Sequence, residues 1–394
     1  MSDPFIVASL PQTSATAVLL GRVQLPAVAG PAVVTLRQGQ VIDITTPAAP
    51  LVRDICEMDD PAAYVRAAAA TGPSLGSFDE IARNSDEARR DSDTPWFLAP
   101  IDLQAIKASG VTFVVSLLER VIEEQARGEP EKAAAIRNEI AALIGDDLSN
   151  LVPGSPEAMA IKATLIAKGV WSQYLEVGIG ADAEIFTKAQ PLSAVGAGAH
   201  IGIHPISTWN NPEPEIALAV SSRGKPVGAL LANDVNLRDV EGRSALLLGK
   251  AKDNNASCAL GPFLRLFDRD FGLDQVRQAD VRLRVEGEDQ FVLEGLSSLS
   301  QISRDPADLV AATINEHHQY PDGLVLLLGT MFAPVKDRDV QGEGFTHKIN
   351  DIVTISSPEL GALSNRVKYT SDCAPWQVGQ ADLFRNLARR KLLQ

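Results

Sequence analysis

A closely spaced pair of carboxylates is the first feature of this chain that suggests chemistry. Glu213 and Glu215 lie two residues apart in the segment NPEPE, residues 211–215, which leads into the apolar run IALAV. Side chains two residues apart on a strand point to the same face, so both carboxylates are expected on one side. Like charges at this spacing repel and raise each other's pKa unless a cation lies between them. The pair therefore indicates either a cation site or a solvated strand edge whose charges discourage aggregation.

A third carboxylate follows the next apolar run. Residues 227–232 predict a buried strand, and Asn233 and Asp234 come directly after it. Three carboxylates with water as a further ligand suit a hard, oxygen-preferring ion, Mg²⁺ first and Mn²⁺ as the alternative. These segments hold no cysteine or histidine, which argues against zinc. We predict that Glu213, Glu215 and Asp234 bind one divalent metal ion.

The elements around these carboxylates are mostly strands. A helix is expected within 297–317, after Asp305 and Pro306. Many strands with few helices between them argue against a doubly wound sheet and favour an α+β or barrel-like fold. The strands predicted from apolar and β-branched runs are 174–179, 184–187, 216–220, 227–232, 281–285, 291–293, 325–328 and 352–355.

The N-terminal part of the chain has a different pattern. Within 16–46, the runs 32–36 and 41–44 flank the polar turn RQGQ and predict a hairpin. Weak periodicity over 47–95 predicts a loosely packed region. Residues 116–170 are helical in pattern, with a helix start at Ser155, Pro156 and Glu157. We predict a smaller N-terminal α/β domain over 1–95 and a catalytic domain over 96–394 that includes the helical segment 116–170.

The overall charge argues against several classes of partner. The chain of 394 residues carries a formal net charge of −14, so it offers no basic footprint to nucleic acid or to an anionic membrane. No apolar stretch approaches the roughly 18 residues that span a bilayer. No secretory signal pattern heads the sequence, and the three cysteines are far apart, as reduced thiols would be. We expect a cytoplasmic protein whose partner is a small molecule.

Several motifs in one order resemble the fumarylacetoacetate hydrolase family. After E-x-E come N-D-V-x-x-R-D at 233–239 and A-K followed by S-C-x-x-G-P at 251–262. AEIFTKA at 183–189, Leu328-Gly329-Thr330 and NDIVTISSPELGALSNRV at 350–367 support them, and the resemblance covers roughly 95–370. It implies a mainly β catalytic domain, a mixed β-roll or barrel, in a homo-oligomer.

The same resemblance implies roles for particular residues. Glu213, Glu215 and Asp234 are the family's metal ligands by motif, and Arg238 is implied to face the substrate. The family's lysine is Lys252 rather than Lys250, because Ser257-Cys258 fixes the register. Gly329 and Thr330 are implied to contact the substrate carboxylate through an amide and a hydroxyl.

One family element is replaced in this sequence. The G-L-N-Y and following histidine of acylpyruvate-cleaving members are replaced by GVTF at 110–113 and SLLER, and no histidine occurs in 101–199. Hydrolysis of a C–C bond is therefore disfavoured. GVTF together with WNNPEPE, GKAKDNNASC and QGEGFTHK instead resembles the sugar-acid branch of the family, the 2-keto-3-deoxy-pentonate dehydratases.

The resemblance predicts a reaction that suits these residues. The substrate would be a 2-oxo sugar acid, 2-keto-3-deoxy-D-pentonate, dehydrated with Mg²⁺ to 2,5-dioxopentanoate in non-phosphorylative pentose catabolism. Such a step needs a base for the C3 proton and an acid for the leaving C4 hydroxyl. Lys252 is the candidate for base or for fixed cation, and Glu184 is the candidate for the second acid–base group, against a surface acid at a strand end.

Alternatives remain for the function and for single residues. The chain would otherwise be a metal-dependent hydrolase of a 2,4-dioxo acid, or a non-enzymatic protein that binds a sugar acid or a metal. Glu119 and Arg120 either close over the substrate or form a solvated helix face. His347, in a glycine-containing loop, is a weaker candidate for a residue that reaches the site.

Overall fold

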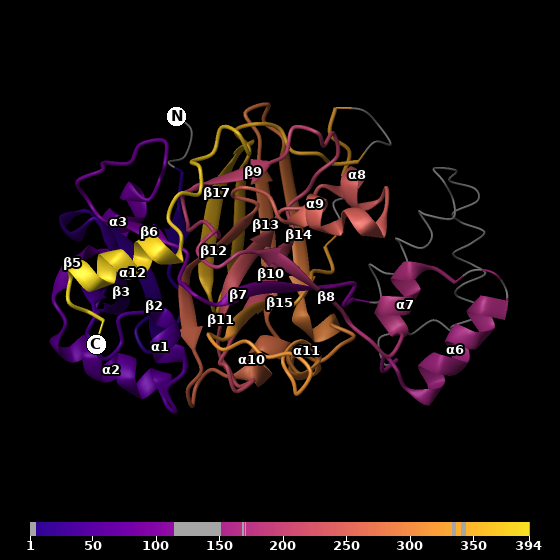
Figure 1. The fold of residues 1–394 in the computed structure, drawn as a ribbon. Helices are drawn as coiled ribbons and strands as arrows, with labels where there is room; N and C mark the ends of the chain where they lie inside the picture. The colour runs from indigo at the N-terminus through magenta and orange to yellow at the C-terminus, as the bar shows by residue number, and fades with distance from the viewer. Residues whose placement is uncertain are drawn as a thin grey trace.

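Two mixed sheets form the body of the protein. The computed structural model describes residues 5–113, 151–167, 169, 171–332, 336–339 and 344–393 (Figure 1). The larger sheet has the order β5 (Ser74–Ser77), β4 (Gln40–Asp43), β3 (Gly30–Arg37), β2 (Leu19–Leu25), β12 (Cys258–Leu266), β11 (Pro226–Asp234), β10 (Pro214–Val220), β15 (Leu324–Leu327), β7 (Ala105–Gly110) and β8 (Glu184–Ala189), with β6 (Trp96–Leu98) paired to β2. The smaller sheet has the order β1 (Ala8–Ser9), β17 (Gly361–Tyr369), β16 (Ile352–Ser357), β13 (Asp280–Glu286) and β14 (Val292–Ser298), with β9 (His200–Ile203) paired to β17.

Among the named strands of the described residues, all but two pairs are antiparallel. The pairs β15–β7 and β17–β9 are parallel. Parallel neighbours in otherwise antiparallel sheets, with helices placed around them, are typical of an α+β fold. The predicted α+β class is therefore confirmed.

The central strands are buried on both faces. In β10, Ile216 and Leu218 belong to the core between the two sheets, whereas Ala217 and Ala219 belong to a second core on the opposite face of the larger sheet. This alternation follows the period of two of a strand. A strand covered on both faces has an unbroken apolar sequence, which explains the run IALAV.

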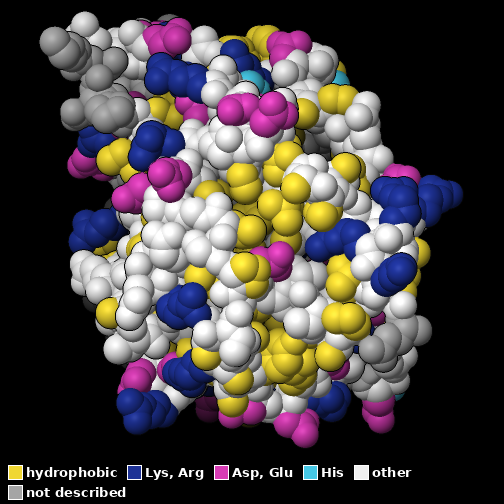
Figure 2. All heavy atoms as spheres, turned by 90° about the vertical axis from the view of Figure 1, so that its left-hand side faces the viewer, with side chains coloured by type: hydrophobic (Ala, Val, Ile, Leu, Met, Phe, Trp, Pro, Cys, Tyr) yellow, Lys and Arg dark blue, Asp and Glu magenta, His cyan; other side chains and the backbone are white. Residues whose placement is uncertain are grey.

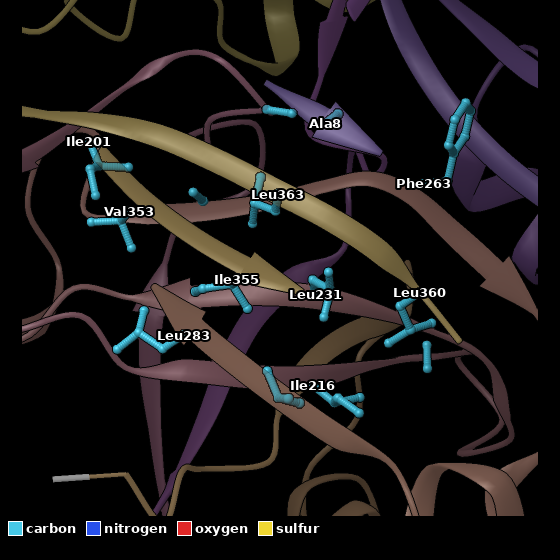
Figure 3. Close-up of a cluster of buried hydrophobic side chains, with 14 of the residues drawn as sticks. Ala8, Ile201, Ile216, Leu231, Phe263, Leu283, Val353, Ile355, Leu360 and Leu363 are labelled. Atoms are coloured by element: carbon cyan, nitrogen blue, oxygen red, sulfur yellow. The ribbon is translucent and has the colours of Figure 1, made fainter. Parts of the chain in front are cut away.

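The first of these cores lies between the two sheets. Figure 3 shows Ile216 and Leu231 from the larger sheet among Leu283, Ile355 and Leu363 from the smaller sheet. On the other face of the larger sheet, α1 (Val52–Cys56) and α2 (Pro61–Thr71) contribute buried side chains to the second core.

The remaining helices lie around the sheets. They are α3 (Phe78–Asn84), α6 (Pro156–Ala167), α7 (Gln173–Ile179), α8 (Arg238–Glu241), α9 (Leu248–Lys252), α10 (Leu273–Arg277), α11 (Pro306–Thr313) and α12 (Gln380–Arg389). In Figure 1, α6 and α7 lie to the side of the sheets, and α12 crosses the N-terminal strands. The Asn386 side chain of α12 donates hydrogen bonds to the carbonyls of Val28 (2.9 Å) and Ala29 (3.0 Å).

Several local predictions are confirmed. The hairpin is formed by β3 and β4, whose turn places Gln38 at φ 52° and Gly39 at φ 76°, as expected for a two-residue turn that follows the strand twist. The helix α6 begins at Pro156, directly after Ser155. Seven of the eight predicted strands correspond to β8, β10, β11, β13, β14, β15 and β16.

The predicted strand 174–179 is wrong, because these residues form α7. The Ser172 side chain accepts a hydrogen bond from the Leu175 amide and so caps the helix, and the helix ends at Gly180. The sequence does not predict the strands β1, β5, β6, β7, β9, β12 and β17. β12 begins within the S-C-x-x-G-P motif, and all of its residues are buried.

The loose packing predicted for 47–95 is also wrong. This region forms α1, α2 and α3, which bury Val52, Ile55, Val65 and Phe78. Alanine-rich α2 has high helix propensity, but its apolar residues show little helical periodicity, so their spacing does not predict the helix. Its start was visible in the sequence: Asp60 accepts from the Ala63 amide, and Pro61 opens the helix.

The large sheet crosses the predicted domain boundary. Strand β2, from the N-terminal region, pairs with β12 through Leu20 and Leu264, and Leu19 and Arg265. The division at residue 95 remains a prediction. Residues 116–150 of the predicted helical segment lie outside the described residues.

The surface carries charges of both signs. Figure 2 shows the face at the left-hand side of Figure 1, where acidic, basic and hydrophobic side chains are interspersed. Among the described residues, no helix combines the length and the apolar character needed to cross a membrane.

Replacement of Leu231 by alanine tests the core between the sheets. Leu231 is 0 % exposed, so Leu231→Ala should lower the free energy of unfolding by about 2–5 kcal/mol through lost burial and a cavity. The control Leu246→Ala, at a side chain that is 95 % exposed, should change it by less than about 0.5 kcal/mol. Urea denaturation followed by circular dichroism measures both, and equal effects would contradict this description of the core.

Candidate metal centre

The three predicted ligands lie where β10 begins and its antiparallel neighbour β11 ends. Glu213 directly precedes β10, Glu215 lies within it, and Asp234 ends β11. The two strands are antiparallel, with Glu215 opposite Ala232, and the Asp234 amide donates to the Glu213 carbonyl (3.1 Å). One carboxylate oxygen from each of the three residues lies within 4.8 Å of the other two. Strand pairing therefore brings Asp234 next to Glu213, which lies 21 positions earlier in the sequence.

The three carboxylates fit a divalent cation. Glu213, Glu215 and Asp234 are 5 %, 2 % and 1 % exposed, so water screens their repulsion poorly. Burial, and then the charges of Asp234 and Glu213, raise the pKa of Glu215 well above its usual range. A cation between the carboxylates would relieve their mutual repulsion. Carboxylate oxygens are also the ligand atoms that Mg²⁺ prefers. Placement of these residues as ligands remains a proposal.

Lys252 lies against the same cluster. Its ammonium group is 2.5 Å from Glu213 Oε2 and 3.1 Å from Asp234 Oδ2, and the side chain is buried at the end of α9. Burial alone would lower the pKa of Lys252, but the carboxylates of Asp234 and Glu213 raise it above its ordinary value. This direction is opposite to the lowered pKa required of a neutral base and agrees with a fixed cation. Lys250, by contrast, is exposed and contacts His204 Nε2 (3.0 Å).

A second buried lysine was not predicted. Lys188, in β8, is 0 % exposed, and its Nζ lies 2.8 Å from Asp234 Oδ1. Despite the cost of burial, the charges of Lys188 and Lys252 lower the pKa of Asp234. The sequence held a signal for this residue, because period-two alternation from Glu184 places Phe186 and Lys188 on the same face of the strand.

The carboxylates line a small cavity that is partly open to solvent. Besides the three carboxylates, the described residues that line it are Ser109, Gly110, Val111, Glu184, Phe186, Glu241, Lys252, Gly329 and Thr330. The predicted acid–base residue Glu184 therefore shares this cavity with Lys252. The two residues come from β8 and α9, which are far apart in the sequence.

The carboxylate of Glu184 lies directly over Gly110. These residues are opposite each other in the β7–β8 pair, and a Cβ added to Gly110 would lie 1.8 Å from Glu184 Oε2. Only glycine leaves room for the carboxylate in this position. The first residue of the GVTF motif thus makes space for a predicted catalytic side chain.

The rest of the GVTF motif holds the loop after β15. Thr112 Oγ1 donates to the Leu328 carbonyl (2.7 Å), and a Cβ on Gly329, whose φ is 86°, would lie 2.2 Å from that hydroxyl oxygen. The Gly329 amide donates to Glu215 Oε2 (2.7 Å), so this amide orients a predicted metal ligand. Val111 has φ 50°, a strained conformation for a β-branched residue, and lines the cavity.

Two other residues near the site were not predicted. The Asn236 side-chain amide donates to both Glu213 Oε1 (3.1 Å) and Glu241 Oε2 (2.6 Å). Asn236 therefore links a predicted ligand to Glu241, a further acid of the cavity. Both residues lie within or beside the N-D-V-x-x-R-D motif, but neither has a spacing that sequence alone would single out.

Other predicted residues lie apart from the cavity. The Arg238 guanidinium lies over the Trp209 ring, 4.4 Å from its centroid, and Arg238 is not among the described residues that line the cavity. Its contact with substrate remains a prediction. His347 is buried, with Nδ1 3.4 Å from Asp351 Oδ2, and does not line the cavity either. Glu119 and Arg120 lie outside the described residues.

Fold and site together define a β-rich protein with a buried carboxylate centre, and comparison with known proteins narrows this class. Residues 176–368 match the family model described as fumarylacetoacetate (FAA) hydrolase C-terminal. The chain is 31 % identical over 185 residues to a 2-dehydro-3-deoxy-D-arabinonate dehydratase of Saccharolobus solfataricus, covering 47 % of this chain and 58 % of that relative. It is also 31 % identical over 184 residues to a "Probable 2-keto-3-deoxyxylonate dehydratase" of Haloferax volcanii, covering 47 % and 60 %.

Solved structures share the fold. A 2-keto-3-deoxy-D-arabinonate dehydratase, complexed with magnesium and 2,5-dioxopentanoate, superposes with a TM-score of 0.61 at 21 % identity, over 89 % of this chain and 99 % of that one. A fumarylacetoacetate hydrolase from Exiguobacterium antarcticum superposes with a TM-score of 0.53 at 15 % identity, over 90 % and 100 %. Residues 176–368 are thus similar to the fumarylacetoacetate hydrolase family, the chain spans about three fifths of the length of the two curated relatives, and the predicted resemblance of the motifs is confirmed.

Replacement of Glu215 by glutamine separates metal binding from folding. Glu215→Gln removes a proposed ligand charge and should weaken Mg²⁺ binding at least about tenfold in isothermal titration calorimetry. Because the pKa of Glu215 is raised in the folded protein, its charge destabilises the fold near pH 7. The variant should therefore keep or raise Tm in the presence of EDTA. Asp253→Asn, at an exposed acid, is the control, and unchanged Mg²⁺ affinity in Glu215→Gln would remove Glu215 from the site.

Proposed function

We propose that this chain is a Mg²⁺-dependent hydro-lyase that dehydrates 2-keto-3-deoxy-D-pentonate to 2,5-dioxopentanoate in non-phosphorylative pentose catabolism. One observation carries the proposal: the buried triad of Glu213, Glu215 and Asp234 opens into the same cavity as Lys252 and Glu184. The two curated relatives, whose names describe dehydratases of such acids, support it. So does the related structure that holds magnesium and 2,5-dioxopentanoate.

The proposed ion would be held by Glu213, Glu215 and Asp234. Bound there, Mg²⁺ would supply a Lewis acid that polarises the 2-oxo group and increases the acidity of the C3 proton. The Gly329 amide and the Asn236 side chain fix Glu215 and Glu213 by hydrogen bonds, which keeps two of the three carboxylates in place. Manganese remains a prediction from the donor chemistry alone.

Lys252 and Glu184 are proposed to transfer the protons. Because Lys252 is held as a cation, Glu184 accepts the C3 proton and Lys252 protonates the C4 hydroxyl, which leaves as water. Transfer of one proton from C5 to C3 and of the C5 hydroxyl proton to C4 then gives the C5 aldehyde of 2,5-dioxopentanoate, so that the substrate loses one water and no carbon. A covalent enzyme nucleophile is not required, and burial raises the pKa of Cys258 to about 12, as in an unreactive thiol.

The cavity offers little for hydrolysis of a 2,4-dioxo acid. Such a reaction needs a group that activates water, and no histidine is among the described residues that line the cavity. The nearest candidate from the sequence, His347, is hydrogen-bonded to Asp351 instead. We propose a homo-oligomeric, cytoplasmic enzyme without nucleic-acid or membrane partners; size-exclusion chromatography of the purified chain tests the first of these properties.

A product assay tests the function directly. The purified protein with Mg²⁺ and 2-keto-3-deoxy-D-xylonate should produce an aldehyde that hydrazine reagents trap, without pyruvate, and EDTA should stop the reaction. Pyruvate formation would indicate C–C cleavage. Turnover of an acylpyruvate with none of the sugar acid would favour the hydrolase and overturn the proposal.

Two lysines separated by one residue provide a matched test of catalysis. Lys252→Met removes the ammonium group that lies in the cavity and should lower kcat at least about 100-fold, as expected for loss of a proton-transfer or charge-stabilising group. Lys250→Met removes an exposed ammonium group of the same helix and should leave kcat within about twofold. Steady-state kinetics measures both, and equal kcat values would exclude Lys252 from the mechanism.

Gly110 gives an independent test of Glu184. A methyl group in Gly110→Ala must displace the Glu184 carboxylate, so kcat should fall at least about tenfold while Mg²⁺ affinity stays near that of the native protein. The control Gly379→Ala places a methyl group where no atom lies within 4 Å. If Gly110→Ala keeps full activity, the position of Glu184 is not important to the reaction.

A further inference from the structure

Lys188 is a buried cation for which the proposed reaction has no direct use. It is 0 % exposed and is not among the described residues that line the cavity. Burial of an ammonium group costs several kcal/mol unless hydrogen bonds and opposite charge compensate. An apolar side chain of similar length would fill the same space without that cost. The contacts of Lys188 therefore need an explanation.

Those contacts converge from three segments of the chain. Lys188 Nζ donates to the Val235 carbonyl (3.0 Å), just after β11, and to the Lys252 carbonyl, at the end of α9. It also lies 3.4 Å from Ser257 Oγ, before β12. Ser257 Oγ in turn donates to the same Lys252 carbonyl (2.8 Å). One ammonium group thus fixes the backbone from which the Lys252 side chain extends.

Lys188 also fixes one side of a carboxylate. Asp234 Oδ1 is 2.8 Å from Lys188 Nζ, whereas Asp234 Oδ2 is 3.1 Å from Lys252 Nζ. Asp234 Oδ2 shares the Lys252 ammonium group with Glu213 Oε2, and Lys252 lines the cavity. Free rotation of the Asp234 carboxylate would break the ion pair with Lys188, so the orientation of this group is set.

We propose that Lys188 is a positioning residue of the metal site, a fixed cation that orients Asp234 toward the ion and holds the end of α9. This inference rests on the proposed function only through the assignment of a metal ion to the carboxylates. Lys188 touches neither substrate nor reacting atoms in this arrangement. It acts through Asp234 and through the backbone of Lys252.

Whether Mg²⁺ binds more weakly or more tightly after Lys188 is replaced distinguishes a positioning role from a purely electrostatic effect of its charge. Loss of a positive charge next to a ligand reduces repulsion of the ion, so an electrostatic role predicts tighter metal binding in Lys188→Met. Loss of positioning predicts the opposite. We expect Lys188→Met to bind Mg²⁺ at least about tenfold more weakly than the native protein, as for other residues that orient ligands.

Lys252→Met is the control, because it removes the same charge from Asp234 Oδ2 and Glu213 Oε2 in the cavity, where the ammonium group would compete with the ion for these oxygens. It should bind Mg²⁺ as tightly as the native protein or more tightly. Isothermal titration calorimetry with Mg²⁺ alone measures all three proteins without any need for turnover. Native or tighter Mg²⁺ binding by Lys188→Met would overturn the proposal.

A second variant decides the question if Lys188→Met does not fold. Lys188→Arg keeps the positive charge, but a planar guanidinium cannot present its donors as an ammonium group does. It should also bind Mg²⁺ more weakly, by about threefold or more, and unchanged affinity in a folded Lys188→Arg would contradict positioning. If the native protein binds no Mg²⁺, the proposed function fails and this inference with it. If it binds Mg²⁺ and both variants match it, the inference alone fails.

Discussion

Repulsion among buried carboxylates is the constraint on which the centre of this protein depends. The β10–β11 pair places Glu213, Glu215 and Asp234 in the interior, where water cannot screen them. Two lysine ammonium groups lie on opposite oxygens of Asp234, and a backbone amide and an asparagine amide bind the other two carboxylates. Among these five groups three negative charges stand against two positive ones, and a divalent cation would offset the remaining negative charge.

The loops around this centre are fitted to each other by small residues and hydroxyls. Gly110 leaves room for Glu184, and Gly329 leaves room for the Thr112 hydroxyl. The strain at Val111 lies between these contacts, at the wall of the cavity. Thus the GVTF motif, which replaces a catalytic element of the hydrolases, has a structural role that the chemistry of its side chains does not reveal.

The parts of the fold and site predictable from the sequence are those governed by short-range patterns. Alternation and apolar runs located β10, β11 and β13, and E-x-E with N-D located the three carboxylates. The role of Lys188 is not predictable from the sequence, because a lysine within a strand is normally exposed. Only its partners from three distant segments explain its burial. The helix α7 was mistaken for a strand because its apolar residues fit both periods, and the cap at Ser172 decides between them.

The contact between α12 and the first strands concerns the order of folding. Asn386 and Val28 are separated by 358 positions, and Leu383 and Leu387 share a small core with Leu51. During synthesis the N-terminal strands must therefore remain without this cover until residues 380–389 have been made. Contacts so distant in sequence form slowly, because a long loop must close before they contribute stability. Aggregation while the N-terminal strands lack this cover is the characteristic risk of such a topology, and docking of α12 ends that exposure.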